Sequence, residues 1–251
     1  MSKVMSNDIM YHIGLRECDA APAAIICGDP GRVEKIARMM DKPQFVASKR
    51  EYTTWSAKID GKRVLIVSHG IGGPSTAICI EELAMIGVKT LIRVGTCGGM
   101  AMDVKTGDLV IAQAAIRAEG TSREYLPVEF PAAADFDVTA ALRDAAASIK
   151  PYHVGVVHCK DSFYGQHSPD RMPVCDELNS KWKAWIAGGC LASEMETAAL
   201  FTVSRVLGLR AGCVLRAVWN QERADAGLTD PDDGDELAAV RCAIEAIKRF
   251  A

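Results

Sequence analysis

The sequence has 251 residues, 49% of them hydrophobic and 24% charged, and its formal net charge of −3 comes from 29 Lys+Arg and 32 Asp+Glu. This balance, with no block of five like charges, indicates a well-packed soluble protein with a small-molecule partner and argues against nucleic-acid or membrane-surface binding. Nine cysteines without a CxxC pair, no apolar run of membrane-spanning length and no signal-peptide pattern favour a cytoplasmic protein with free thiols over a secreted or zinc-binding one.

The first half of the sequence alternates apolar strands with amphipathic helices. In chain order it predicts a strand at 23–27, a helix at 31–40, strands at 50–59 and 62–69, and, over 70–87, a glycine loop that leads into a helix ending at Gly87. The two adjacent strands form a hairpin, because Asp60-Gly61 between them is a dipeptide typical of tight turns.

The second half continues the alternation without a linker or an internal repeat. It predicts strands at 90–96 and 107–117, a helix at 137–149, a strand at 153–159, helices at 173–189 and 194–208, a strand at 211–219 and a helix at 235–250. The pattern predicts one α/β domain over residues 1–251, a three-layer α/β/α sandwich with a central mixed β-sheet. Glycines that follow several strands are expected to gather at one edge of that sheet.

Two glycine turns carry arginines. "GDPGR" follows a strand and opens a helix, where free N–H groups and Arg32 suit an anion, although the motif alone fits an ordinary turn better. Arg93 lies inside an apolar strand that exits through Thr96 and Gly98, so its guanidinium needs either a structural ion pair or a ligand. Together with Arg50, just before a strand, these arginines suit a divalent oxyanion such as phosphate.

The segment "KDSFYGQHSPDRMP" (160–173) is interpreted as a polar loop that leaves a buried strand. The amide of Gln166 offers a donor and an acceptor side by side, which matches the edge of a pyrimidine, and Arg171 can bind a carbonyl that gains negative charge. Taken alone, the segment fits a solvated surface loop better than a binding site.

"LASEMETAALF" (191–201) places two carboxylates at the start of an apolar helix. Ser193 and Glu196 have the spacing of a capping box, which needs no functional role. Glu196 also heads an apolar stripe through Leu200 and Val203, where an ionised carboxylate needs hydrogen-bonding partners. The stretch by itself leaves helix capping and ligand binding as alternatives.

Several common catalytic motifs are missing from the sequence. There is no GxSxG, HExxH or P-loop, and "GIGGPS" is not a dinucleotide-binding fingerprint. His69 and His158 each end a buried strand and are interpreted as core histidines rather than catalytic bases.

Six motifs in this order, "GDPGRVEKIA", "REYTTW", "GIGGPST", "RVGTCGG", "FYGQH" and "SEMETAAL", resemble those of the nucleoside phosphorylase family over almost the whole chain. The resemblance implies reversible phosphorolysis of uridine, with phosphate as co-substrate and no required cofactor. It also implies a hexamer built as a trimer of dimers, with active sites shared across each dimer and room for a potassium ion at the dimer interface.

The resemblance further implies roles for individual residues. Phosphate would be bound by Gly28, Arg32, Arg93, Thr96 and Arg50 of the partner subunit. Ribose would be bound by Met195, Glu196 and His12 of the partner subunit, and uracil by Cys97, Gly98, Phe163, Gln166, Arg171 and Glu194. The monovalent cation would lie near Glu51, Ile71 and Ser75.

Some positions depart from the family pattern. Arg171 lies further from Gln166 than the corresponding arginine of well-known members, and Cys97 stands where many members have threonine. Trp219 stands where a small aliphatic residue is common, which would narrow the pocket near C5 of the pyrimidine. Purine-specific relatives have an aspartate that protonates the base where this sequence has Asn220, so the resemblance favours a pyrimidine.

Alternatives from several classes remain. A purine nucleoside phosphorylase would cleave inosine, and a hydrolytic nucleosidase of the same fold would release the base without phosphate. A non-catalytic nucleoside-binding protein would bind uridine and release no uracil, whereas an NAD-linked oxidoreductase is disfavoured by the missing fingerprint. The sequence leaves open whether Arg223, in "NQERADAG", closes over the site.

Overall fold

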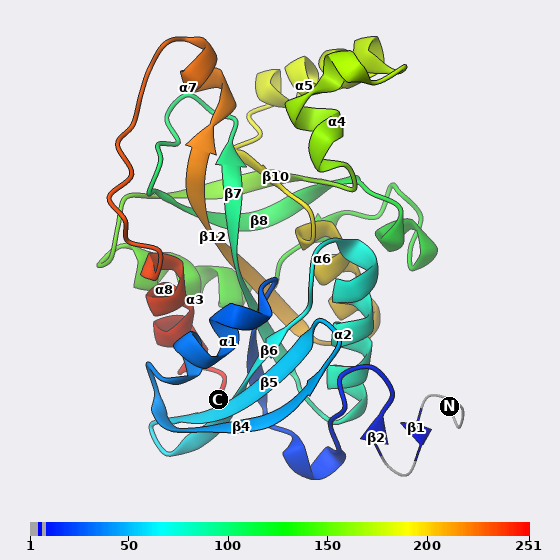
Figure 1. Ribbon diagram of the computed structural model, residues 1–251, viewed down its shortest axis with the longest axis vertical. Helices are drawn as coiled ribbons and strands as arrows, with labels where there is room; N and C mark the ends of the chain where they lie inside the picture. Colours follow the sequence, from blue (N-terminus) through cyan, green and yellow to red (C-terminus); the bar gives the residue numbers. More distant parts are fainter. Residues whose placement is uncertain (1–4, 7–8) are drawn as a thin grey trace.

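The computed structural model describes residues 5–6 and 9–251, and Figure 1 shows their arrangement. Two short strands near the N-terminus, β1 (Met5–Ser6) and β2 (Ile9–Met10), pair antiparallel. The later strands form one mixed sheet. They are β3 (Ala23–Cys27), β4 (Asp41–Lys49), β5 (Tyr52–Ile59), β6 (Lys62–Ser68), β7 (Thr90–Gly99), β8 (Leu109–Ala118), β9 (Ala132–Ala133), β10 (Tyr152–Lys160), β11 (Ala192–Glu194) and β12 (Arg210–Asn220).

Helices cover both faces of this sheet. The α-helices are α1 (Pro30–Ala37), α2 (Gly73–Met85), α3 (Phe136–Ala146), α4 (Phe163–His167), α5 (Cys175–Ala187), α6 (Thr197–Val206), α7 (Gln221–Asp225) and α8 (Ala238–Ile247). Short 3-10 helices are η1 (Glu17–Asp19), η2 (Thr121–Glu124) and η3 (Pro169–Arg171). Helices α2 and α6 lie on one face of the sheet and α1, α3 and α8 on the other (Figure 1), which confirms the predicted three layers.

The two core layers follow from the alternation of side chains along the buried strands. In β3, Ile26 packs in the same apolar cluster as Leu83 of α2 and Leu200 of α6, whereas Ile25 packs on the opposite side with Ile36 of α1. All five residues of β3 are buried. A strand covered on both faces has to be apolar throughout, which is why "AAIIC" has no polar positions.

The strand order is β11-β10-β8-β12-β7-β3-β6-β5-β4, with β9 beside β8. Strand β11 also pairs antiparallel with β7, Ala192 opposite Gly99 and Ser193 opposite Gly98. Strands β7, β12, β8, β10 and β11 are therefore each paired with the next and close into a ring. This closure places Ser193 and Glu194 beside the end of β7.

Most predicted elements are confirmed within a few residues. The turn between β5 and β6 has positive φ at Asp60 (50°) and Gly61 (80°), as expected for a type I′ hairpin. Within the residues described, no helix combines the length and apolarity needed to span a membrane.

Three segments differ from the predictions. The sequence pattern predicts no element at 41–49, but β4 forms there as a mostly exposed edge strand whose sequence does not alternate. The segment 160–173 is no simple loop, because it contains α4 and η3. The helix predicted at 194–208 begins only at Thr197, since Glu194 belongs to β11.

Candidate active site

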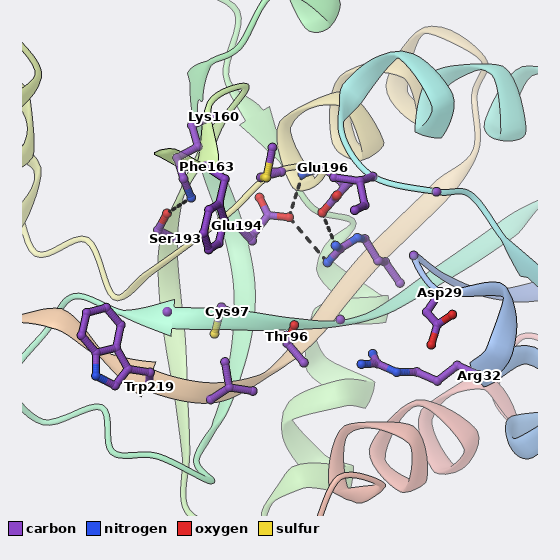
Figure 2. Close-up of a pocket in the computed structure, with 18 of the residues that line it drawn as sticks. Asp29, Arg32, Thr96, Cys97, Lys160, Phe163, Ser193, Glu194, Glu196 and Trp219 are labelled. Atoms are coloured by element: carbon purple, nitrogen blue, oxygen red, sulfur yellow. Dashed lines mark hydrogen bonds and ion pairs between the residues drawn. The ribbon is translucent and has the colours of Figure 1, made fainter. Parts of the chain in front are cut away.

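A cavity of about 850 Å³ lies where β3, β7, β10, β11 and β12 end (Figure 2). Gly28 after β3, Gly70 after β6 and Gly98 near the end of β7 all line it, which confirms that glycine exits gather at one edge of the sheet. A side chain at Gly28 would meet the Gly70 carbonyl oxygen at 3.1 Å. The close approach of these two turns therefore favours glycine at position 28.

The structure brings most of the predicted site residues to this cavity. They are Gly28, Arg32, Glu51, Ile71, Arg93, Thr96, Cys97, Gly98, Phe163, Glu194, Met195 and Glu196. Further lining residues, for which no site role is predicted from the sequence, include Asp29, Gly70, Lys160, Ser193 and Val218. His167 and Trp219 line the cavity as well.

One end of the cavity is formed by the start of α1 and the middle of β7. Asp29 caps α1 by accepting the backbone N–H of Gly31 at 2.8 Å, and Arg32 follows in the first helical turn, where its side chain points to the cavity (Figure 2). Arg93 approaches from β7. Two guanidinium groups next to a helix N-terminus make this end suitable for a phosphate dianion.

Arg93 forms a buried ion-pair cluster with two carboxylates. Its Nη2 contacts Glu196 Oε2 in a short ion pair and its Nη1 lies 3.5 Å from Glu194 Oε2. Position 95 has to be glycine, because a side chain there would occupy the space of the Arg93 guanidinium. A structural ion pair and a ligand were the two alternatives for Arg93. The residue forms structural ion pairs and also lines the cavity, where it can contact a ligand.

The pKa values of the two carboxylates in the cluster are shifted in opposite directions. Burial raises the pKa of Glu194 above its ordinary value, although Arg93 opposes this shift. For Glu196, burial also disfavours ionisation, but the attraction of Arg93 and further contacts, such as the backbone N–H donated by Gly72, together hold the pKa below its ordinary value. Glu196 is therefore ionised at neutral pH.

Glu196 keeps capacity for a ligand. Its Oε1 accepts the backbone N–H of Gly72 at 2.8 Å and its Oε2 faces Arg93. A carboxylate has about four acceptor positions, so two are left toward the cavity. This geometry suits a pair of neighbouring hydroxyl groups, such as those of ribose.

The capping box predicted for Ser193 and Glu196 is wrong. Ser193 lies in β11, and the start of α6 is instead capped by Glu194, whose carboxylate accepts the N–H groups of Glu196 and Thr197 at 2.9 Å each. The carboxylate of Glu194 therefore fixes both Arg93 and the helix start.

The opposite end of the cavity is lined by aromatic and polar side chains. Phe163 and His167 come from α4, and the His167 ring lies 5.7 Å from the Trp219 ring, centroid to centroid. Lys160 Nζ donates to Ser193 Oγ at 2.5 Å. This mixture of ring faces and donors suits a planar base that carries carbonyl groups.

Gln166 and Arg171 do not line the main cavity. Gln166 lines an adjoining cavity of about 530 Å³ and accepts a hydrogen bond from Ser193 Oγ at 2.5 Å. Arg171 is exposed, with its guanidinium 5.9 Å from the centre of the Tyr164 ring. In this structure, these two residues are therefore not placed to form hydrogen bonds with the edge of a base bound in the main cavity.

His12, Arg50 and Ser75 also lie away from the cavity of their own chain. His12 Nδ1 is 2.6 Å from Glu82 Oε1, and Arg50 is an exposed residue with φ of 56° between β4 and β5. Ser75 Oγ donates to the Ile71 carbonyl at 3.2 Å, so these two members of the expected cation site are adjacent.

The core histidines are held neutral. Burial, followed in effect by the charge of Arg93, lowers the pKa of His69 to about 3, and its Nδ1 lies 3.1 Å from Thr76 Oγ1. His158 stacks on Trp185 at 4.0 Å between ring centroids, and burial lowers its pKa to about 3 as well. Both agree with the interpretation as core residues.

Arg223 does not close over the cavity in this structure. Its guanidinium donates to both carboxylate oxygens of Asp230, at 2.6 and 2.7 Å, and to the Met102 carbonyl at 2.7 Å. It ties the segment after α7 to the loop after β7.

Comparisons with known proteins agree with this geometry. A family model described as the phosphorylase superfamily matches residues 22–250. The uridine phosphorylase of Treponema pallidum (strain Nichols) is 53% identical over 249 residues, which cover 99% of this chain and 96% of the relative. That of Escherichia coli (strain K12) is 43% identical over 252 residues, covering 98% and 100%. A guanosine phosphorylase of Halorubrum lacusprofundi is 40% identical over 223 residues, 88% of each chain.

Proposed function

Because this chain belongs to the phosphorylase superfamily, we propose that it catalyses the reversible phosphorolysis of uridine to uracil and ribose 1-phosphate. The observation that carries the proposal is the position of the ionised Glu196 in one cavity, between the arginines at one end and Phe163 at the other. Similarity over nearly the full length to proteins named uridine phosphorylase supports the choice of base.

In this reaction, the protein acts mainly by positioning phosphate and the nucleoside relative to each other. Arg32 and Arg93 hold phosphate beneath the anomeric carbon, with Gly28 and Thr96 lining the same end of the cavity. Glu196 accepts hydrogen bonds from the ribose hydroxyls and fixes the sugar. The glycosidic bond then breaks through an oxocarbenium-like state, for which no covalent enzyme intermediate is required.

The hydrogen bonds of the Asn220 side chain favour a pyrimidine over a purine as the base. Its amide donates to the carbonyl oxygens of Ala101 and Val104, each at 2.8 Å, and its Oδ1 accepts the N–H of Arg223 at 3.1 Å. Both amide protons are thus engaged within the protein, and a carboxamide has no acidic proton to give to a purine ring. Because one relative is named a guanosine phosphorylase, phosphorolysis of a purine nucleoside is the second candidate.

The oligomeric state belongs to the same proposal. We expect a hexamer of three dimers, in which His12 and Arg50, remote from the cavity of their own chain, complete the site of the partner subunit. Potassium would bind near Glu51, Ile71 and Ser75 at that interface, and no organic cofactor is needed. The nine free cysteines support a cytoplasmic setting.

The proposal is tested by incubating the protein with uridine, deoxyuridine, thymidine, cytidine, inosine or adenosine, each with and without phosphate, and measuring the free base. We expect uracil from uridine only when phosphate is present. Phosphate-independent release would identify a hydrolase, and faster cleavage of inosine than of uridine would overturn the pyrimidine assignment.

Substitution of Arg32 by alanine is expected to raise the KM for phosphate by about 10–100-fold, the loss of one charge-assisted hydrogen bond of about 1.5–3 kcal/mol. The folded state should be little affected, since Arg32 is only partly buried. Initial rates over a range of phosphate concentrations measure the effect.

The matched control for Arg32 is Arg38→Ala. Arg38 is the C-cap of α1, paired with Glu34 on an exposed face and absent from the cavity lining. The Arg38→Ala variant should leave the KM for phosphate unchanged. If the two variants behaved alike, Arg32 would not bind phosphate.

Substitution of Trp219 by valine is expected to raise the turnover of 5-methyluridine relative to uridine by about 10-fold, the discrimination that one methyl group allows in an apolar pocket. Trp219 lines the cavity beside His167. Rates with both nucleosides measure the ratio, and an unchanged ratio would show that the C5 position does not face Trp219.

A further inference from the structure

Lys160 is a buried cation in the wall of the cavity. It is the last residue of β10 and lines the end of the cavity that holds Phe163 and Ser193 (Figure 2). Only 7% of its surface is exposed. In the part of the chain that the structure describes, its ammonium has one hydrogen bond, to Ser193 Oγ. Since an ammonium has three donors, two remain for a bound ligand.

The charge of Lys160 is not balanced by an ion pair. Across residues 5–6 and 9–251 it forms no salt bridge, whereas the nearby carboxylates of Glu194 and Glu196 are both engaged by Arg93. Burial lowers the pKa of Lys160 below its ordinary value, and the attraction of Glu194 only partly opposes this shift. A buried cation without an ion-pair partner destabilises the folded protein by several kcal/mol unless an anion binds beside it.

We propose that Lys160 is a catalytic residue that stabilises the negative charge of the departing base. The proposal rests on the phosphorolysis of uridine proposed above, in which the base leaves as an anion at the end of the cavity where Lys160 lies. The phosphate end, formed by Arg32, lies across the cavity from Lys160 (Figure 2).

The step requires no proton transfer from the enzyme. A phosphate oxygen forms a bond to C1′ of the ribose while the bond from C1′ to N1 of uracil breaks. The electron pair of the broken bond moves onto the base, where N1, O2 and O4 share it. Lys160 donates a hydrogen bond to a carbonyl oxygen of this anion and keeps its proton. The uracil anion takes a proton from water, and the new phosphate ester releases to water the proton that hydrogen phosphate carried.

Such a contact strengthens as the reaction proceeds. The carbonyl oxygens of bound uridine are neutral, but they gain charge as the glycosidic bond breaks. A fixed ammonium in a site of low dielectric therefore stabilises the transition state more than the ground state.

A purely positioning role is the alternative for Lys160. Ser193 Oγ accepts from Lys160 and donates to Gln166 Oε1, so Lys160 also lies at the end of a hydrogen-bonded chain that orients an amide. That role would affect all nucleosides equally. A role in charge stabilisation depends on how stable the leaving anion is by itself.

The decisive experiment compares Lys160→Met with the unaltered protein on uridine and on 5-fluorouridine, whose base leaves as a more stable anion. Methionine has a similar length, no charge and a preference for burial. We expect kcat for uridine to fall about 100-fold, as when one donor to a developing anion is removed, and kcat for 5-fluorouridine to fall about 10-fold. The KM for phosphate should not change.

Lys183→Met is the matched control, because Lys183 is an exposed lysine of α5 that does not line the main cavity. It should leave both rates unchanged. A Lys160→Gln variant, which keeps a donor without the charge, should give the same pattern as Lys160→Met and decides the result if the methionine variant unfolds.

Equal losses on the two nucleosides would overturn the catalytic role and leave Lys160 as a positioning residue. Unchanged rates would overturn both roles. If the unaltered protein released no uracil from uridine and phosphate, the proposed function itself would fail, and the role of Lys160 would fail with it.

Discussion

Replacing Arg93 by methionine is expected to lower the free energy of unfolding by about 3–5 kcal/mol. It is also expected to weaken phosphate binding so far that the reaction rate no longer saturates with phosphate. Arg93 is 4% exposed, and its loss would leave the buried carboxylates of Glu194 and Glu196 next to each other without a cation. Breaking a buried pair by removing one partner has a cost of that size. Denaturant unfolding and phosphate titration measure the two effects.

The matched control for Arg93 is another buried arginine outside the cavity. Arg216 on β12 is 3% exposed and forms ion pairs with Asp232 and Asp233. Arg216→Met should also destabilise the protein but leave the KM for phosphate near its normal value. If Arg93→Met kept a normal KM for phosphate, the assignment of the phosphate end would be wrong.

Replacing Glu196 by glutamine is expected to lower kcat/KM for uridine by about 100-fold, which corresponds to about 3 kcal/mol for hydrogen bonds made to a charged acceptor. An amide has one acceptor oxygen, and the Gly72 N–H and Arg93 already compete for it. The stability should change less than in Arg93→Met, because Arg93 keeps Glu194 as a partner.

Deoxyuridine is the matched substrate for this variant. It lacks the 2′-hydroxyl, so one of the acceptor positions of Glu196 is unused in the normal enzyme. The loss on Glu196→Gln should therefore be about 10-fold for deoxyuridine rather than about 100-fold. Equal losses for the two nucleosides would show that Glu196 does not bind the 2′-hydroxyl.

Much of the fold could be predicted from local patterns. The buried run "AAIIC" and the Asp60-Gly61 turn each determine their structure through short-range physics, side-chain alternation in the first case and positive φ in the second. Strand β11 could not be predicted, since three residues are too few to show a period. It exists because β10 and β7 offer open edges on both of its sides.

The site was predictable where a sequence motif carries its chemistry, as at "GDPGR" and "RVGTCGG". The position of Lys160 and Ser193 in the cavity wall was not predicted, because it depends on the pairing of β10 with β11, which aligns His158 with Ser193 and Cys159 with Glu194. A signal was present in "HVGVVHCK", where an apolar strand ends in a lysine. Like Arg93 inside its strand, that lysine is a cation in an apolar segment and needs a partner or a ligand.

The hydrogen bonds of Asn220 limit how this chain could evolve toward other bases. Both amide protons are given to carbonyl oxygens of the segment 101–104. An aspartate at this position would turn acceptor oxygens toward those two carbonyls, so its carboxylate would face repulsion instead of two hydrogen bonds. A single substitution to aspartate is therefore expected to destabilise the 101–104 segment, so a change toward purine cleavage at this position would have to be accompanied by changes in that loop.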